Sequence, residues 1–236
     1  MYALSEKSLS PDAESDSVAC MGATHPPEGV LQQNVERPDG CSSGCFSDCP
    51  TCRRLRKAAV QVAVRDGIAA TTSDAIAKLA EVPPERAAEH YPTADDCLAA
   101  AYDEGALRLR RVCVRTLRGD GTWQERLRAT VDAAIEEFRK RPELARFCMV
   151  EVSRSDNRVL CASRLAARER FVAILAEECG VEDADLPELR FEMLAGAAHH
   201  MVLGQLQDDG DTGSVRERLD QVIDLFEPER RTADRS

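Results

Sequence analysis

The sequence predicts an all-α protein on three observations. Aromatic residues make up only 4% of its 236 residues, while Ala, Leu, Arg and Glu are plentiful. That balance favours helices over sheets, which are rich in β-branched and aromatic residues. Apolar residues recur at steps of three and four positions along much of the chain, as in amphipathic helices. No segment alternates polar and apolar residues for long enough to indicate a strand.

The first helix is expected to start at Arg53. Its apolar stripe is formed by Leu55, Ala58, Ala59, Val62 and Ala63. Gly67 is a typical C-terminal stop. A second helix is expected after the N-cap candidates of residues 71–73. Its inward-facing residues are predicted to be Ile76, Ala77 and Leu79.

Prolines set the limits of the third helix, because Pro84 suits a first helical position and Pro92 ends the pattern. A longer fourth helix is expected from Ala94 to about Arg118. Further helices are predicted at about 122–140, 142–154, 157–179, 187–208 and 214–226. Three short helices followed by a long one is the arrangement found in helix-turn-helix proteins.

Charge is distributed unevenly along the chain. The net charge of −11 argues against a protein that coats nucleic acid non-specifically. Residues 1–52 carry −6 and residues 119–236 carry −8, whereas residues 53–118 carry +3. A small DNA-reading module on an acidic body is compatible with this pattern.

The N-terminal sequence is polar and acidic and has no apolar core of a secretory signal. No stretch approaches the roughly 20 apolar residues needed to span a bilayer. The ten cysteines are therefore expected to be reduced thiols or metal ligands, and not a disulfide framework. A cytoplasmic protein without a membrane partner is predicted.

Several short runs are more specific than the helical pattern. They are Ala58-Ala59, Asp66-Gly67, Thr71-Thr72, Asp74-Ala75-Ile76-Ala77, Ala80-Glu81-Val82, Glu89-His90-Tyr91 and Cys97-Leu98-Ala99-Ala100-Ala101-Tyr102. Together they resemble the N-terminal domain of TetR/AcrR-family transcriptional regulators. The resemblance implies a helix-turn-helix DNA-binding domain at residues 53–103 and a helical effector-binding and dimerisation domain at 104–228. Residues 1–52 would be a disordered extension with a cysteine cluster, and 229–236 a tail.

The resemblance also implies DNA-binding residues. They are Arg53, Arg54, Thr72, Pro83, Pro84, Glu85, Arg86, Glu89 and His90. Arg86 alone on the recognition helix can present a bidentate donor pair to guanine. Thr72 would cap the second helix and touch a phosphate, and His90 would donate to a phosphate, while Tyr91 packs in the domain core. Arg56 and Lys57 would lie near the DNA backbone, although a solvated helix start is an equal alternative for these basic residues.

Three positions depart from the family pattern. Ala88 stands where an aromatic residue is usual, Ala94 where a lysine is usual, and Glu81 where a glycine is usual in the turn. Losing two phosphate contacts and adding a carboxylate should lower non-specific affinity and flatten its salt dependence.

In the family, the C-terminal helices enclose a small-molecule pocket. The candidates here are Trp123, Phe138, Phe147, Met149, Phe171, Met193, His199 and His200. Plain core is the commoner role for such apolar residues. His199 and His200 point about 100° apart on a helix and cannot both face one spot. Small residues at 195–198 and Gly204, with the apolar stripe of 215–226, predict a homodimer through the last two long helices.

The cysteine cluster has the spacing C-x3-C-x3-C-x2-C and consists of Cys41, Cys45, Cys49 and Cys52. Four thiolates could bind zinc or hold an iron–sulfur cluster, and the last pair also matches a redox C-x-x-C motif. An incidental tail is the alternative, because one short segment seldom supplies all four ligands. The remaining cysteines at helical positions are expected to be small core residues.

The sequence thus predicts a ligand-responsive repressor that binds a palindromic operator as a dimer, with an unidentified small-molecule effector. The alternative is a diverged relative with weak DNA binding that acts as a redox- or metal-responsive or ligand-binding protein. An enzyme is not expected, because the sequence has no Gly-rich phosphate loop, no G-x-S-x-G and no H-E-x-x-H.

Overall fold

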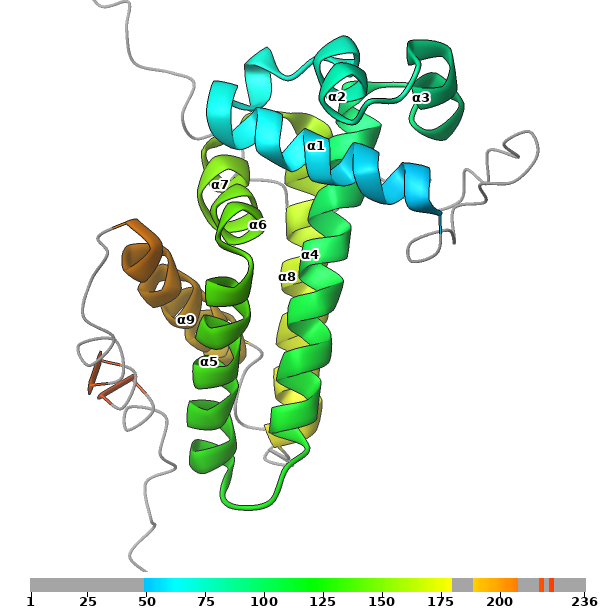
Figure 1. The fold of residues 1–236 in the computed structure, drawn as a ribbon. Coiled ribbons are helices and arrows are strands. Elements are labelled where there is room, and N and C mark those ends of the chain that lie inside the picture. Colours follow the sequence, from blue (N-terminus) through cyan, green and yellow to red (C-terminus); the bar gives the residue numbers. More distant parts are fainter. Residues whose placement is uncertain (1–48, 180–188, 208–216, 219–220, 223–236) are drawn as a thin grey trace, which may run out of the picture. The chain divides into compact units, whose positions relative to one another are not determined.

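The computed structural model describes residues 49–179, 189–207, 217–218 and 221–222. Every regular element in these residues is helical (Figure 1), which confirms the all-α prediction. The elements are α1 (Pro50–Asp66), η2 (Ile68–Ala70), α2 (Ser73–Leu79), α3 (Pro84–His90), α4 (Ala94–Leu117), α5 (Trp123–Lys140), α6 (Pro142–Arg146), η3 (Phe147–Glu151), α7 (Val152–Arg154), α8 (Arg158–Cys179) and α9 (Leu189–Gln207). None of the described helices is both long and apolar enough to cross a membrane. Most of the helix predicted at 214–226 lies outside the described residues.

Helix α1 begins before the predicted Arg53. Cys49 is its N-cap residue, and Pro50 occupies the first helical position, where the missing N–H costs nothing. At the other end Gly67 adopts a φ of 88°, and its N–H donates to the carbonyl of Ala63 at 2.9 Å. A positive φ is inexpensive for glycine, so the helix ends there.

Helix α2 is fixed by a cap at each end. The Thr72 hydroxyl accepts a hydrogen bond from the Ala75 N–H at 3.2 Å, as predicted. At the C-terminus Glu81 adopts a φ of 53°, and the N–H of Val82 donates to the carbonyl of Ala77 at 3.0 Å. This is the Schellman arrangement, in which glycine is the preferred left-handed residue. The structure therefore explains why a glycine is usual where Glu81 stands.

One inward-facing prediction in α2 is wrong. Ile76 and Ala77 are buried, but Leu79 is 42% exposed. At about 100° per residue, Leu79 lies about 200° around the helix from Ala77. A helix this short buries only one side, so Leu79 faces outward.

Helix α4 is the central element, because it packs against α1, α5 and α8 (Figure 1). Its start is fixed by a capping box between Thr93 and Asp96, and that of α5 by one between Thr122 and Glu125. In each box the threonine accepts from the backbone while the carboxylate accepts from the threonine N–H, which satisfies two otherwise unpaired donors.

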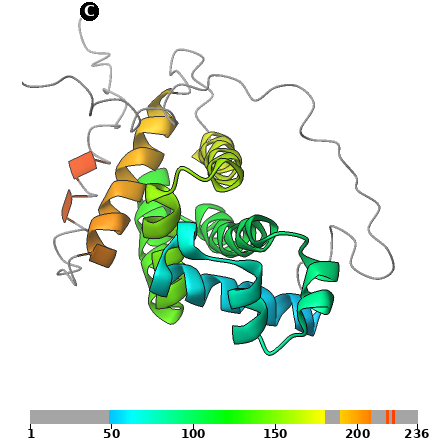
Figure 2. The same ribbon diagram turned by 90° about the horizontal axis from the view of Figure 1, so that it is seen from above.

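Two apolar cores lie along α4. We call α1, α2, α3 and the first half of α4 the head. The head core joins residues of these helices to Phe147, Val152 and Leu160, which are fully buried although they follow α5 in sequence. The second core is formed by residues of α4, α5, η3, α8 and α9. Seen from above, α9 lies at the outer edge of the described helices (Figure 2).

Candidate nucleic-acid interface and internal cavity

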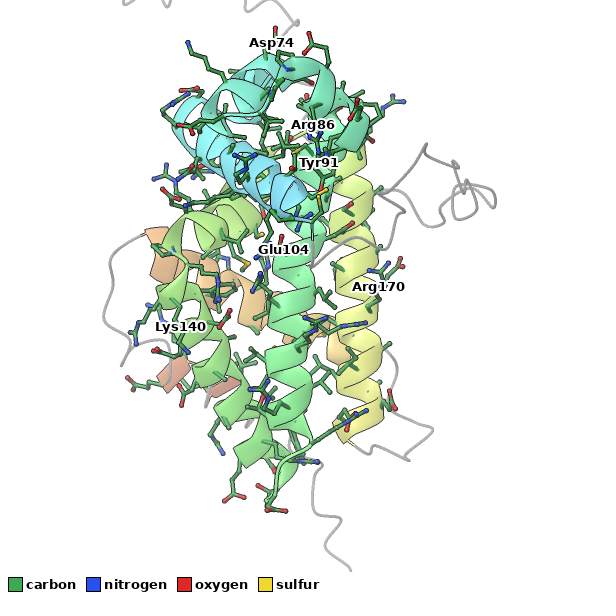
Figure 3. The ribbon with its side chains drawn as sticks, turned by 45° about the vertical axis from the view of Figure 1, so that its right-hand side comes forward. Asp74, Arg86, Tyr91, Glu104, Lys140 and Arg170 are labelled. Carbon is green, nitrogen blue, oxygen red and sulfur yellow. The ribbon has the colours of Figure 1, made fainter. Side chains whose placement is uncertain are left out.

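All but one of the predicted DNA-binding residues are exposed. The exposed ones are Arg53, Arg54, Thr72, Pro83, Pro84, Glu85, Arg86 and Glu89, whereas His90 is half-buried. Helix α3 buries only Ala87 and turns the half-buried His90 toward α1, whereas its other residues are exposed. Arg86 therefore lies on an exposed helix face (Figure 3), and the methyl of Ala88 is exposed as well.

The charge of this face is not strongly positive. The exposed charged residues of α2, α3 and the turn between them are Asp74, Lys78, Glu81, Glu85, Arg86 and Glu89. Acidic groups therefore outnumber basic ones. The start of α1 adds exposed positive charge at Arg53, Arg54 and Lys57. Helices α2 and α3 therefore offer few cationic groups, and the start of α1 is the main cationic surface of the head.

Arg56 does not belong to that surface, which corrects the expectation that it lies near a DNA backbone. Its side chain is only 3% exposed, and its Nε donates to Glu104 at 2.6 Å. Its Nη1 donates to the hydroxyl of Tyr91 at 2.9 Å. The group thus joins α1 to α4 and to the residue that follows α3 (Figure 3).

The ionisation of these groups follows from their contacts. Burial alone would raise the pKa of Glu104, but hydrogen bonds from Arg108 and Arg56 hold that pKa below its ordinary value. Burial raises the pKa of Tyr91 well above its ordinary range, despite the hydrogen bond from Arg56. The pair is therefore a charged Arg56–Glu104 ion pair with a neutral Tyr91, which packs against the head core as predicted.

His90 faces α1. Its Nδ1 lies 3.3 Å from Cys52 Sγ, and its ligand nitrogen and the sulfurs of Cys49 and Cys52 all lie within 4.8 Å of one another. Burial, followed by the positive charge of Arg86, lowers the pKa of His90. A neutral imidazole is a weaker phosphate donor than an imidazolium, so the predicted phosphate contact gains no support from charge. Cys41 and Cys45, the other predicted ligands, lie outside the described residues.

A cavity of about 760 Å³ opens between α4, α5, α6, η3, α8 and α9. Four predicted pocket residues line it: Phe138, Met149, Phe171 and His199. Its arginines are Arg108, Arg110, Arg141, Arg164, Arg168 and Arg170, against Asp103 and Glu137 as the acidic residues. The volume is in the range of small-molecule sites, and an apolar wall with a few charged groups is typical of them.

Arg164 is the most informative cation in this wall. Its Nε is buried and has no hydrogen-bond partner among the described residues. An orphaned buried donor costs free energy, and Arg164 is one of the residues that line the cavity. Partial burial, followed by the charge of Arg164, lowers the pKa of His199 at the rim, so that ring is neutral near pH 7.

Four other predicted pocket residues do not line this cavity. Phe147 is fully buried in the head core, and Trp123 packs against the second core. Met193 is 57% exposed on α9, and His200 is also exposed. Sequence spacing placed these side chains on the correct helices, but it did not indicate which neighbour each helix face meets.

Sequence reasoning missed the arginines, Leu144 of α6 and Cys148 of the π-helical turn η3. Cys148 and Leu144 line the cavity, and both lie close to Gly105 of α4. A Cβ added to Gly105 would come within 2.7 Å of Cys148 Sγ. Gly105 therefore permits the close approach of α4 to η3, a role that a lone helical glycine does not reveal in the sequence.

Comparison with protein-family models and with curated proteins gave no match. Solved structures do match. The fatty acid degradation regulator FadR from Bacillus halodurans is 20% identical, with a TM-score of 0.62 over 78% of this chain and 98% of that one. A TetR-family transcriptional regulator from Rhodococcus sp. is 18% identical, with a TM-score of 0.63 over 75% and 98%. FadR from Bacillus subtilis, in complex with stearoyl-CoA, is 19% identical, with a TM-score of 0.60 over 73% and 96%.

The fold is that of the TetR-type regulators. The head is the part of this fold whose sequence resembles the family. The likeness extends over nearly the whole length of the solved chains, so the C-terminal helices, which carry no sequence motif, share the arrangement too.

Proposed function

We propose that this chain is a TetR-family transcriptional regulator that binds DNA as a homodimer and releases or retains it in response to a small molecule. The observation that carries the proposal is the exposed α3 face around Arg86, held by a capped α2 and a Schellman turn. A helix in this position can enter the major groove, which is about 12 Å wide. We assign it no enzymatic activity and place it in the cytoplasm.

DNA reading would divide between two surfaces. Arg86 would contact a guanine edge, whereas Arg53, Arg54 and Lys57 at the start of α1 would contact phosphates. Because acidic residues outnumber basic ones on α2 and α3, non-specific affinity for DNA is expected to be low. The ratio of specific to non-specific affinity should therefore be higher than for a head with a basic face. Occupying a palindromic operator in this way would repress transcription.

The dimer would form through α9 and the segment that follows it. Met193 is an exposed apolar side chain on α9, and no atom of another described element lies within 4 Å of a Cβ added to Gly196 or Gly204. Small residues with open space beside them allow another helix to approach closely. A two-fold dimer would place its two recognition helices about 34 Å apart, one turn of DNA.

The effector we propose is an amphipathic anion with a long acyl chain. The apolar wall of the cavity would hold the chain, and the positive charge of Arg164 would attract the anionic group. The solved FadR from Bacillus subtilis binds stearoyl-CoA, and we extend that class of ligand to this chain.

Coupling between the cavity and the head would run through η3. Cys148 and Met149 line the cavity, while the preceding Phe147 and the following Val152 are fully buried in the head core. A ligand that moves the first pair must also move the second, since interiors are close-packed.

The test is fluorescence anisotropy with the upstream region of the chain's own gene and with a scrambled sequence, at two salt concentrations. Arg86→Ala should weaken specific binding about tenfold to a hundredfold, a cost of roughly 1–3 kcal/mol, and leave scrambled DNA nearly unaffected. Lys140→Ala removes an exposed positive charge from α5 and is the matched control. Equal binding of Arg86→Ala and the unsubstituted chain would contradict the proposal.

A second candidate is a diverged member that binds ligand but not DNA. The acidic α2–α3 face and the exposed Ala88 methyl favour it. This candidate predicts that the unsubstituted chain binds its own upstream region no more tightly than scrambled DNA at either salt concentration. Acyl ligands should still bind.

A further inference from the structure

Three potential metal ligands from distant parts of the sequence meet at one corner of the head. Cys49 precedes α1, Cys52 lies in its first turn, and His90 is the last residue of α3. Their ligand atoms all lie within 4.8 Å of one another. We propose that Cys49, Cys52 and His90 bind one zinc ion, which ties the recognition helix to the start of α1.

The distances suit a tetrahedral ion. With Zn–S of about 2.3 Å and Zn–N of about 2.0–2.1 Å, tetrahedral geometry separates neighbouring ligand atoms by roughly 3.5–3.8 Å. Cys52 Sγ and His90 Nδ1 are 3.3 Å apart. Small rotations of the side chains therefore suffice to seat an ion, and no helix has to move.

The fold itself brings these residues together. Pro50 starts α1, so Cys49 precedes the first turn and Cys52 lies in it. The C-x-x-C spacing lets both sulfurs face one ion. Tyr91, the residue after His90, is hydrogen-bonded to Arg56 of α1 at 2.9 Å. That bond holds the end of α3 against α1 and keeps the imidazole beside Cys52.

The donor set selects the metal. Two thiolates and an imidazole suit zinc, whereas iron–sulfur clusters are usually held by four thiolates. The sequence alone suggested a site of cysteines only, because His90 is 38 residues from Cys52. Among the described residues, His90 joins Cys49 and Cys52 as a third potential ligand from a distant part of the sequence.

The ion would act on the part of the head that has the fewest contacts. Helix α3 has seven residues, and Ala87 is the only one of them that is buried. A metal bond at His90 would fasten the C-terminal end of this helix to α1. Zinc would therefore hold Arg86 in place for DNA, and this control would be separate from that of an effector in the cavity. Zinc binding itself does not depend on DNA binding, and the two can fail separately.

The test uses the full chain, stripped of metal, reduced and titrated with Zn²⁺ and then with Co²⁺. We expect one ion per chain and a thiolate-to-cobalt charge-transfer band. Cys49→Ser, Cys52→Ser and His90→Gln should each weaken Zn²⁺ binding at least tenfold. Cys161→Ser and His200→Gln change the same residue types away from the site and should bind as the unsubstituted chain does. Circular dichroism checks that each variant remains helical.

Two further measurements separate the alternatives. A Cys41→Ser/Cys45→Ser variant should still bind one ion, and zinc X-ray absorption of the unsubstituted chain should show sulfur together with imidazole ligands. Hydrogen exchange should slow in α3 on adding Zn²⁺ and stay unchanged in α5, whether or not the chain binds DNA. Undiminished Zn²⁺ binding by His90→Gln, or no Zn²⁺ uptake by the reduced chain, overturns the proposal.

Discussion

Replacing Arg56 by Met removes the buried charge that joins α1 to Tyr91 and Glu104 but keeps most of the apolar stem. The lost contacts are a charge-assisted hydrogen bond of 2.6 Å and a hydrogen bond of 2.9 Å to a phenol. Such bonds contribute roughly 1.5–3 and about 1 kcal/mol. Glu104 keeps its partner Arg108 and is 20% exposed, so it is not left as an uncompensated charge. We expect the free energy of unfolding to fall by about 2.5–4 kcal/mol.

Arg56→Ala should cost about 1 kcal/mol more, because the buried stem is lost as well. Urea unfolding followed by circular dichroism measures both effects, at one fixed protein concentration because a dimer's stability depends on concentration. Arg54→Ala removes an exposed neighbouring arginine and should change stability by less than about 0.5 kcal/mol. If both Arg56 variants fall within that margin too, the buried pair does not stabilise the head and the reasoning is refuted.

The same pair sets a pH dependence. The folded-state pKa of Glu104 lies below its ordinary value of 4.5. Its contribution is therefore fully present above about pH 4.5 and is lost as the pH falls through the folded-state pKa. The stability difference between the unsubstituted chain and Arg56→Met should stay constant from pH 6 to 8 and shrink in acid. A difference that grows in acid would contradict this assignment.

Three other substitutions test separate features. Glu81→Gly should raise the free energy of unfolding by about 0.5–1 kcal/mol, because φ at this position is 53°; an unchanged urea midpoint would contradict the strain. Gly105→Ala should lower the free energy of unfolding by about 1–3 kcal/mol, because the added Cβ meets Cys148 Sγ at 2.7 Å. Adding Cys148→Ala should restore most of this loss. Arg164→Met should weaken stearoyl-CoA binding at least tenfold in calorimetry, while Arg158→Met, an exposed change on the same helix, should not.

The elements that the sequence predicted well are those with local signals. Pro84 and Pro92 bracket α3, Gly67 ends α1 and Thr72 caps α2, and each acts within a few residues of its own position. They placed the end of α1, the start of α2 and the limits of α3 to within a residue, whereas α1 starts at Pro50 and not at the predicted Arg53.

The errors have a common physical origin, since each depends on which surfaces meet. An arginine at the start of an amphipathic helix reads as solvated, yet Arg56 finds Glu104 on another helix. Phe147 reads as a pocket residue, yet it packs into the head. His90 lies 38 residues from Cys52, and no periodicity links them. Such contacts follow from tertiary packing, which a single sequence does not encode locally.

The π-helical turn at Phe147–Glu151 accommodates one residue more per turn than the α-helical segments on either side. Sliding that extra residue along the segment would rotate the side chains it passes by about 100° about the helix axis, without breaking the segment. A residue facing the cavity could then turn toward the head, and its neighbour could take its place. The segment can therefore convert ligand binding in the cavity into a rotation of the side chains that contact the head core.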